Sequence, residues 1–258
     1  MELDRIYNDD CLEGMKAIPS GSIDAVICDL PYGVLNSESE GGSWDSIIPL
    51  EPLWEQYLRL IKPNGAIVLF CQGMFTAKLM MSQPKIWRYN LIWDKINRPT
   101  GFLNANRCQL RIHEDIAVFY KAQPTYNPQM TKGVASHRRG AAGNAELAGG
   151  KNRCYGGFKM TKPEYSNEKF PTSIIAMDKE HNGNEWHPTQ KPVNLIRYLV
   201  RTYTNEGDTV LDNCMGSGTT AIACIKEKRH FVGFELNKEY YDKACKRIEA
   251  EQSQLKLF

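Results

Sequence analysis

The sequence lacks the features that mark membrane, secreted and metal-binding proteins. None of its apolar runs approaches the roughly 18 residues that a membrane-spanning helix needs, and its first residues, Met-Glu-Leu-Asp, resemble no secretory leader. Its eight cysteines stand singly, without a Cys-x-x-Cys pair. We therefore expect a cytoplasmic protein with reduced thiols, no membrane partner and no metal site.

An excess of charge of one sign is also lacking. The chain has 32 Lys and Arg residues against 30 Asp and Glu residues, a formal net charge of +2. So small a balance does not itself indicate a nucleic-acid partner, which has to be argued from where the charges lie. The 258 residues, 42% of them hydrophobic, suffice for one large α/β domain with an inserted module.

The most informative stretch follows a short apolar run at residues 23–28. The run is rich in β-branched side chains and predicts a buried strand, which stops at Asp29-Leu30-Pro31-Tyr32-Gly33. Ligands of open α/β sheets bind at the carboxyl ends of strands. An acceptor carboxylate, a stiff turn and a flat aromatic ring there suit a flat substrate group that carries an amine. Taken alone, an ordinary strand-to-loop turn explains this stretch equally well.

A second pattern lies near the end of the sequence. A predicted strand at 209–211 leads into a Gly-x-Gly turn, a helix from about Ala221, and a strand at 231–234 that ends in Glu235. Glycines let the backbone approach a ligand closely, and a helix amino terminus offers free amides. An acid at this spacing suits a carboxylate that accepts both hydroxyls of a ribose. The turn residues concerned are Asp212, Asn213, Gly216, Ser217, Gly218, Thr219 and Thr220.

A dinucleotide-dependent dehydrogenase would share most of that pattern. The turn lacks the third glycine of the dinucleotide fingerprint, however, and Asp212 at its first position would repel a pyrophosphate. An acid there better suits a cationic ligand with a sulfonium and an α-ammonium group, a description that fits S-adenosylmethionine. The dehydrogenase is therefore the least favoured reading.

Residues 122–186 differ in character from the rest. They hold nine Lys and Arg residues against six Asp and Glu residues, with aromatic residues interleaved and little periodicity. A surface insertion explains this composition. A module that contacts nucleic acid, with cations for phosphates and aromatic rings for bases, explains it as well. We prefer the second reading because of what stands on either side.

Taken together, these motifs resemble one family. Asp29-Leu30-Pro31-Tyr32 resembles the Asp/Asn/Ser-Pro-Pro-Tyr motif of the amino-group DNA methyltransferases, and residues 187–192, 211–220 and 231–235 resemble their cofactor motifs. The order is similar to that of the β-class, a circular permutation of the usual sheet. The resemblance implies a Rossmann-like, S-adenosylmethionine-dependent methyltransferase sheet, circularly permuted, with an inserted recognition segment. Its parts would be a catalytic half (1–121), a target-recognition insertion (122–186) and a cofactor-binding half (187–258).

The resemblance also implies roles for single residues. A flipped base stacks on Tyr32, and the carboxylate of Asp29 and the carbonyl of Leu30 accept hydrogen bonds from its exocyclic amine beside the stiff Pro31. The cofactor-binding residues would be Asp10 and Cys11 near the adenine, Thr189 and Lys191 near the methionine carboxylate, Asp29, Asp212, Asn213, Gly216, Ser217, Gly218, Thr219, Thr220 and Glu235. The sequence departs from the family in Leu30 for the first proline and in Asn213-Cys214 for Pro-Phe. His113-Glu114 resembles a further family feature, although such a pair is more often a surface or core-edge contact.

The implied function is transfer of a methyl group from S-adenosylmethionine to N6 of an adenine in double-stranded DNA. Adenine is preferred to cytosine because of Asp29, by family habit. A homodimer and a cognate restriction enzyme are further partners that the resemblance allows. Cytosine N4, RNA or a glutamine amide of a protein remain open as targets, and a non-catalytic nucleic-acid binder is a fourth reading.

Overall fold

The computed structural model describes residues 1–33, 45–133, 151–152, 156–157, 167–179 and 190–255. These residues divide into two compact units, each described by itself below. The larger unit joins Met1–Asn127 to Ser173–Phe258, and the smaller unit is Pro128–Thr172.

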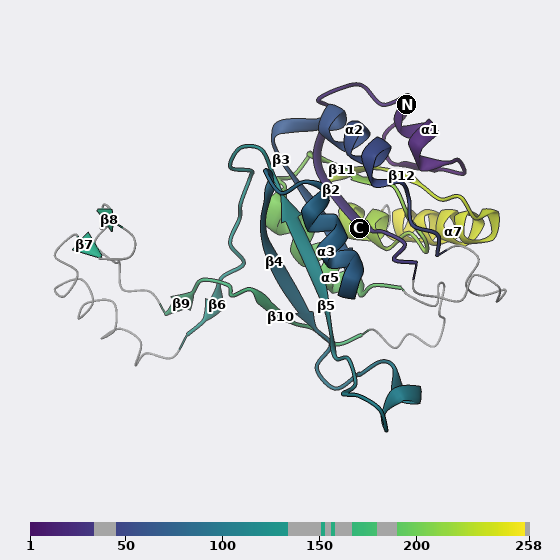
Figure 1. Ribbon diagram of the computed structural model, residues 1–258. Coiled ribbons are helices and arrows are strands. Elements are labelled where there is room, and N and C mark those ends of the chain that lie inside the picture. Colours follow the sequence, from purple (N-terminus) through teal and green to yellow (C-terminus); the bar gives the residue numbers. More distant parts are fainter. Residues whose placement is uncertain (34–44, 134–150, 153–155, 158–166, 180–189, 256–258) are drawn as a thin grey trace. The chain divides into compact units, whose positions relative to one another are not determined.

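The larger unit is built on an eight-stranded mixed sheet in the order β1-β12-β11-β2-β3-β5-β4-β10 (Figure 1). Neighbouring strands are parallel except for β5, which runs antiparallel to both β3 and β4. This arrangement confirms the predicted α/β class. The strands are β1 (Arg5–Tyr7), β2 (Ile23–Asp29), β3 (Ile61–Cys71), β4 (Trp87–Asp94), β5 (His113–Phe119), β10 (Ile174–Ala176), β11 (Thr209–Asp212) and β12 (His230–Phe234).

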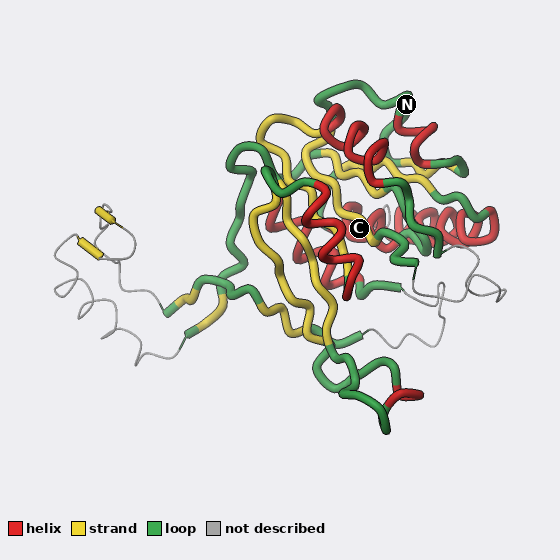
Figure 2. The backbone as a smooth tube through the Cα atoms, in the orientation of Figure 1, coloured by secondary structure: helices red, strands yellow, loops and turns green. Residues whose placement is uncertain are grey.

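Helices cover both faces of this sheet (Figure 2). They are α1 (Cys11–Met15), α2 (Leu50–Leu60) and α3 (Gly73–Ser82) on one face, and α5 (Val193–Tyr203), α6 (Thr219–Lys226) and α7 (Lys238–Leu255) on the other. Within the described residues, no helix is both long and apolar enough to cross a membrane.

Strand β2 shows why the apolar runs of the sequence predict central strands. Successive side chains of a strand point to opposite faces, and a strand covered on both faces reads as a continuous apolar run. Ala25 and Ile27 pack in the core beneath α5, whereas Val26 and Cys28 pack in the core beneath α2. All four side chains are buried.

Strand β10 was not predicted. Its three residues lie inside the segment assigned to the insertion, yet they pair in parallel with β4, and Ile175 is buried opposite Trp93. At the other end, the backbone N–H of Asn127 donates to the carbonyl of Thr202 at 2.8 Å. The described residues 122–127 and 173–179 therefore belong to the larger unit, and the smaller unit begins at Pro128 and ends at Thr172.

The smaller unit contains two short antiparallel ladders among its described residues. One joins β6 (Thr131–Lys132) to β9 (Glu168–Lys169), and the other joins β7 (Lys151–Asn152) to β8 (Gly156–Gly157). Most of the basic residues of the predicted insertion lie outside the described residues. Its assignment to target recognition therefore stays a prediction.

Both helical layers should be needed for stability. Leu53 on α2 and Leu199 on α5 are fully buried, so Leu53→Ala and Leu199→Ala should each lower the free energy of unfolding by about 2–5 kcal/mol through the cavity left behind. Leu199→Met nearly conserves volume and should cost less than about 1.5 kcal/mol. Urea unfolding measures all three. Equal tolerance of alanine and methionine at 199 would contradict the packing.

Candidate active site

A cavity of about 950 Å³ lies where neighbouring strands of the sheet end, and both sequence motifs contribute to it. Asp29 is the last residue of β2, Asp212 the last of β11, and Glu235 directly follows β12. These strands are parallel, so their carboxyl ends meet at one edge, where α/β proteins bind ligands. The predicted residues that line the cavity are Asp10, Cys11, Asp29, Leu30, Pro31, Tyr32, Lys191, Asp212, Asn213, Ser217, Thr219, Thr220 and Glu235. Gly216 and Gly218 are not among the lining residues, and Thr189 lies outside the described residues.

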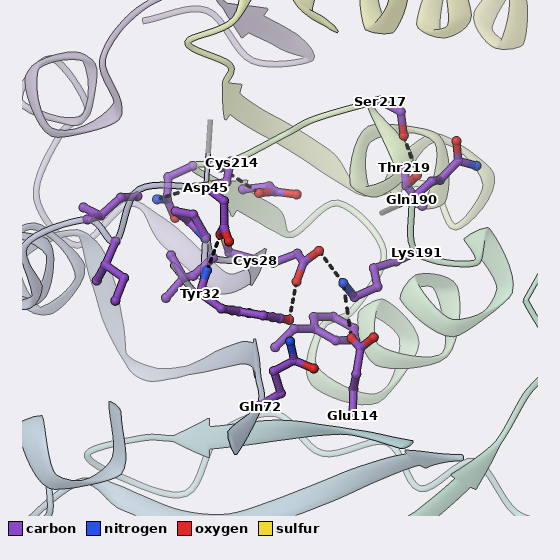
Figure 3. Close-up of a pocket in the computed structure, with 18 of the residues that line it drawn as sticks. Cys28, Tyr32, Asp45, Gln72, Glu114, Gln190, Lys191, Cys214, Ser217 and Thr219 are labelled. Carbon is purple, nitrogen blue, oxygen red and sulfur yellow. Dashed lines mark hydrogen bonds and ion pairs between the residues drawn. The ribbon is translucent and has the colours of Figure 1, made fainter. Parts of the chain in front are cut away.

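Both carboxylate oxygens of Asp29 are engaged, by the Tyr32 and Lys191 side chains that are labelled in Figure 3. The Tyr32 hydroxyl donates to Oδ1 at 2.6 Å, and the Lys191 ammonium donates to Oδ2. Burial raises the pKa of Asp29 above its ordinary value, and the positive charge of Lys191 opposes that rise. Each carboxylate oxygen has two lone pairs, so Asp29 can still accept hydrogen bonds from a ligand in the cavity.

Asp45 holds the turn that follows Asp29. Its Oδ1 accepts the backbone N–H of Tyr32 at 2.8 Å and that of Gly33 at 3.0 Å. Gly33 has φ +68°, and a Cβ there would lie 2.8 Å from a side-chain carbon of Ile47, so this position requires glycine. The Leu30 side chain is buried in the core. The packing of the Leu30 side chain and the two hydrogen bonds that Asp45 accepts hold this turn in place of the first proline of the motif. Sequence reasoning missed Asp45, which has no local signal.

A chain of alternating charges runs through the floor of the site. Lys95 pairs with Glu114 Oε1, the Nζ of Lys191 lies 3.3 Å from Glu114 Oε2, and the same Nζ pairs with Asp29. Lys95 and Lys191 are only 2% and 8% exposed. The two ammonium groups and the two carboxylates cancel in charge, so the cluster can be buried without leaving an unpaired charge.

The pKa values in this chain follow from burial opposed by opposite charges. Burial alone would raise the pKa of Glu114, but the charges of Lys191 and Lys95 outweigh it and lower that pKa. Burial alone would lower the pKa of Lys191, but Asp29 and Glu114 outweigh it and raise that pKa. The structure therefore keeps Lys191 protonated and its ammonium directed at Asp29. The sequence offers two interpretations of Glu114, a family feature or a surface or core-edge contact, and neither indicates that it is a direct partner of this lysine.

Two acids hold the turn at residues 212–220, which we call the cofactor turn. Asp212 Oδ1 accepts the Cys214 N–H at 3.0 Å, and its Oδ2 accepts the Thr220 hydroxyl at 2.6 Å. Burial raises the pKa of Asp212 to about 6. Glu235 Oε2 accepts the Gly216 N–H and its Oε1 accepts the Asn237 N–H, both at 2.8 Å. Each acid thus shapes the turn through two hydrogen bonds and has acceptor capacity left.

The chain matches the family described as DNA methylase, with N6 and N4 specificities, over residues 23–246. It belongs to that family. The Escherichia coli (strain K12) DNA adenine methyltransferase YhdJ is 25% identical over 96% of this chain and 83% of its own length. The type II methyltransferase M1.MboII of Moraxella bovis is 27% identical over 95% of this chain and 96% of its own.

Solved structures agree with this assignment. The crystal structure of the M1.HpyAVI–SAM complex superposes with a TM-score of 0.61 at 27% identity, over 94% of this chain and 98% of that one. The cytosine-N4-specific PvuII DNA methyltransferase superposes with a TM-score of 0.65 over 96% of this chain and 91% of that one. Its identity of 15% supports a shared fold alone.

Two residues of this DNA methylase have structural duties that the sequence did not reveal. Asp10 caps α1, because its Oδ1 accepts the N–H of Leu12 at 2.8 Å and that of Glu13 at 3.2 Å. Asn213, one of the departures from the family motif, is 3% exposed and accepts the Tyr57 hydroxyl from α2. The departure therefore ties the cofactor turn to a covering helix.

Removing the charge of Lys191 should move the pH dependence of catalysis. In Lys191→Met, Asp29 loses the cation that lowers its pKa and faces Glu114 without compensation, so Asp29 should stay protonated to higher pH. The acid limb of the kcat profile should shift upward, with activity recovering as pH rises. Lys191→Arg keeps the charge and is the matched control. An unshifted acid limb in Lys191→Met would contradict the coupling.

Proposed function

We propose that this DNA methylase transfers a methyl group from S-adenosylmethionine to N6 of an adenine that has been turned out of duplex DNA. The observation that carries the proposal is the single cavity that Asp29 and Tyr32 share with Asp212 and Glu235. A group that accepts an amine and a site suited to the cofactor thus face the same space. That juxtaposition is what direct transfer between two bound molecules requires.

The residues present fit S-adenosylmethionine. Glu235 has lone pairs left for ribose hydroxyls after accepting its two backbone N–H groups, and the buried carboxylate of Asp212 supplies negative charge beside a cationic ligand. M1.HpyAVI, 27% identical to this chain, was solved as a SAM complex. S-adenosylmethionine is accordingly the cofactor, and it supplies an electrophilic methyl group when bound.

Tyr32 and Asp29 would hold the target base. Turning a base out of the stack costs a few kcal/mol, and stacking on an aromatic ring such as Tyr32 returns roughly 1–3 kcal/mol. The carboxylate of Asp29 would accept an N–H of the exocyclic amine, which draws the nitrogen toward tetrahedral geometry and frees its lone pair. Lys191 favours the ionised form of Asp29 that this bond requires.

Asp29 can also take up the proton that the methylated amine must lose. Burial raises its pKa, which makes it a better base than an exposed aspartate. Lys191 remains charged and holds the carboxylate in place through the transfer. No nucleophilic side chain is needed in this scheme.

The finer assignments are proposals too. Adenine is supported by Asp29, by family habit, and by the name of the relative YhdJ; cytosine N4 is the second candidate, supported by the fold shared with the PvuII enzyme. RNA and protein amide targets are weaker alternatives. We also retain the β-class permutation, target recognition by 122–186, a homodimer and a cognate restriction enzyme as predictions.

Labelled cofactor tests the function directly. Protein incubated with methyl-labelled S-adenosylmethionine and unmethylated genomic DNA should place the label in N6-methyladenine after digestion. Asp29→Asn should reduce turnover by at least about 100-fold, since general acid–base groups contribute roughly 10²–10⁴, while Asp242→Asn, on α7 and not lining the cavity, should not. Label in N4-methylcytosine would correct the base alone. No label in DNA despite cofactor binding would overturn the proposal.

Cofactor affinity should depend on the ionisation of Asp212. Its pKa of about 6 means that it is anionic above that pH and neutral below it. A cationic cofactor should therefore bind more weakly as the pH falls from 7.5 to 5.5, as measured by isothermal titration calorimetry. Asp212→Asn should bind weakly and lose most of this pH dependence. If the variant keeps the full dependence, another group is responsible.

A further inference from the structure

The connection between β4 and β5 forms a structured projection, residues 95–112, which we call the finger. It stands out beyond the ends of the two strands in Figure 1. Backbone hydrogen bonds between Thr100 and Arg111 close it as a hairpin, at 2.7 and 3.3 Å, and a short 3₁₀ turn (η1, Phe102–Asn104) forms its tip. The finger is thus held by its own backbone.

The tip carries two large apolar side chains in full contact with solvent. Phe102 is 75% exposed and Leu103 is 85% exposed. Every residue from 101 to 113 is exposed, so the described structure provides no apolar cover for this pair. Single exposed apolar residues are ordinary, but two adjacent ones at the tip of an ordered projection favour an interaction site.

The charge of the finger has one sign. It contains Lys95, Arg98, Arg107 and Arg111 and no Asp or Glu. Lys95 is buried against Glu114, and Arg98 pairs with Asp178. Arg107 and Arg111 are exposed, and neither forms an ion pair with a described residue; Arg111 donates instead to the neutral amide of Gln72. Two guanidinium groups therefore keep their charge for an anionic partner.

The finger also borders the catalytic cavity. Thr100, Asn104 and Arg111 line the same cavity as Asp29 and Tyr32. A base held against Tyr32 would therefore leave its duplex next to this projection. One short segment therefore combines an exposed apolar tip, two arginines that form no ion pair with a described residue, and a position beside the proposed base-binding residues.

We infer that the finger binds duplex DNA at the target site, with Arg107 and Arg111 on phosphates and Phe102-Leu103 wedged into the stack that the flipped base leaves. The inference rests on the proposed function. Apolar side chains inserted between base steps are a known means of unstacking DNA, and arginines on phosphates fix the position of a protein without reading sequence. An acidic protein surface would satisfy the arginines but not explain why the apolar tip stands beside the catalytic cavity.

The wedge is tested with Phe102→Ala/Leu103→Ala. On duplex DNA carrying the target site, mapped by sequencing methylated genomic DNA, kcat/KM should fall at least about tenfold. A second duplex places an abasic site opposite the target base, which is then unpaired and easier to extrude. On that duplex the kcat/KM of the variant should lie close to that of the unchanged enzyme. Cofactor affinity and melting temperature should not change. Met81→Ala is the control, because it removes a similarly exposed apolar side chain, 73% exposed at the end of α3, that does not line the cavity.

The phosphate contacts are tested with Arg107→Gln/Arg111→Gln. DNA affinity should fall, and the plot of log Kd against log salt should become shallower by roughly one to two units, since each phosphate contact contributes about 0.9. Lys85→Gln, an exposed cation at the amino end of β4, is the matched control.

These outcomes separate the finger from the proposed function. Suppose that the unchanged enzyme methylates DNA. The finger inference is then overturned, and the proposed function stands, if the Phe102→Ala/Leu103→Ala variant loses the same factor in kcat/KM on both duplexes. The same holds if the Arg107→Gln/Arg111→Gln variant keeps the salt dependence of Kd of the unchanged enzyme. If the unchanged enzyme neither binds nor methylates duplex DNA, both fail. If the finger variants lose binding to a protein partner and none to DNA, the inference is likewise overturned.

Discussion

The site depends on one buried ammonium shared by two carboxylates. Lys191 lies between Asp29 at the end of β2 and Glu114 near the start of β5, and Lys95 satisfies the far side of Glu114. These residues lie far apart in the sequence, so the ion network joins the segment that carries Asp29 to the segment that precedes α5. Breaking a buried network by removing one partner typically costs about 3–5 kcal/mol. The catalytic edge is therefore assembled as a unit.

The same network explains how a buried aspartate can remain useful. Burial pushes Asp29 toward its neutral form, which would offer an amine a poorer acceptor, and a fully solvated aspartate would be a poorer base. Lys191 opposes the burial without removing it. Glu114 in turn keeps Lys191 charged. Lys191 thus makes the ionised form of Asp29 more favourable than burial alone would allow, although the nearby charge of Glu114 works against it.

Those parts of the fold and the site that depend on neighbouring residues could be predicted from the sequence, whereas contacts between distant residues could not. The strands that carry Asp29 and Asp212 are short apolar runs that stop at turn residues, and the cofactor turn combines glycines with a following helix, so both motifs were visible in sequence. The Glu114–Lys191 pair joins residues far apart in the chain, and nothing near either one indicates the other. Asp45 accepts the backbone N–H groups of Tyr32 and Gly33, which lie 13 and 12 positions before it, and nothing in the sequence marks it as their acceptor. Strand β10 has three residues and too little periodicity to be recognised.

The energy of base extrusion connects the interior of the site with the finger. In the proposed mechanism, stacking on Tyr32 would return roughly 1–3 kcal/mol, whereas opening a pair and unstacking the base costs a few kcal/mol, so the cavity alone would leave the balance near zero or unfavourable. The hydrogen bond to Asp29 replaces one that the amine made in the duplex and adds little net gain. A further contribution has to come from the DNA that remains behind. The finger offers it in Phe102 and Leu103, whose exposure in the free protein is relieved when they occupy the vacated stack. In this proposal the end of β2 binds the extruded base, and the finger occupies the gap that the base leaves in the duplex.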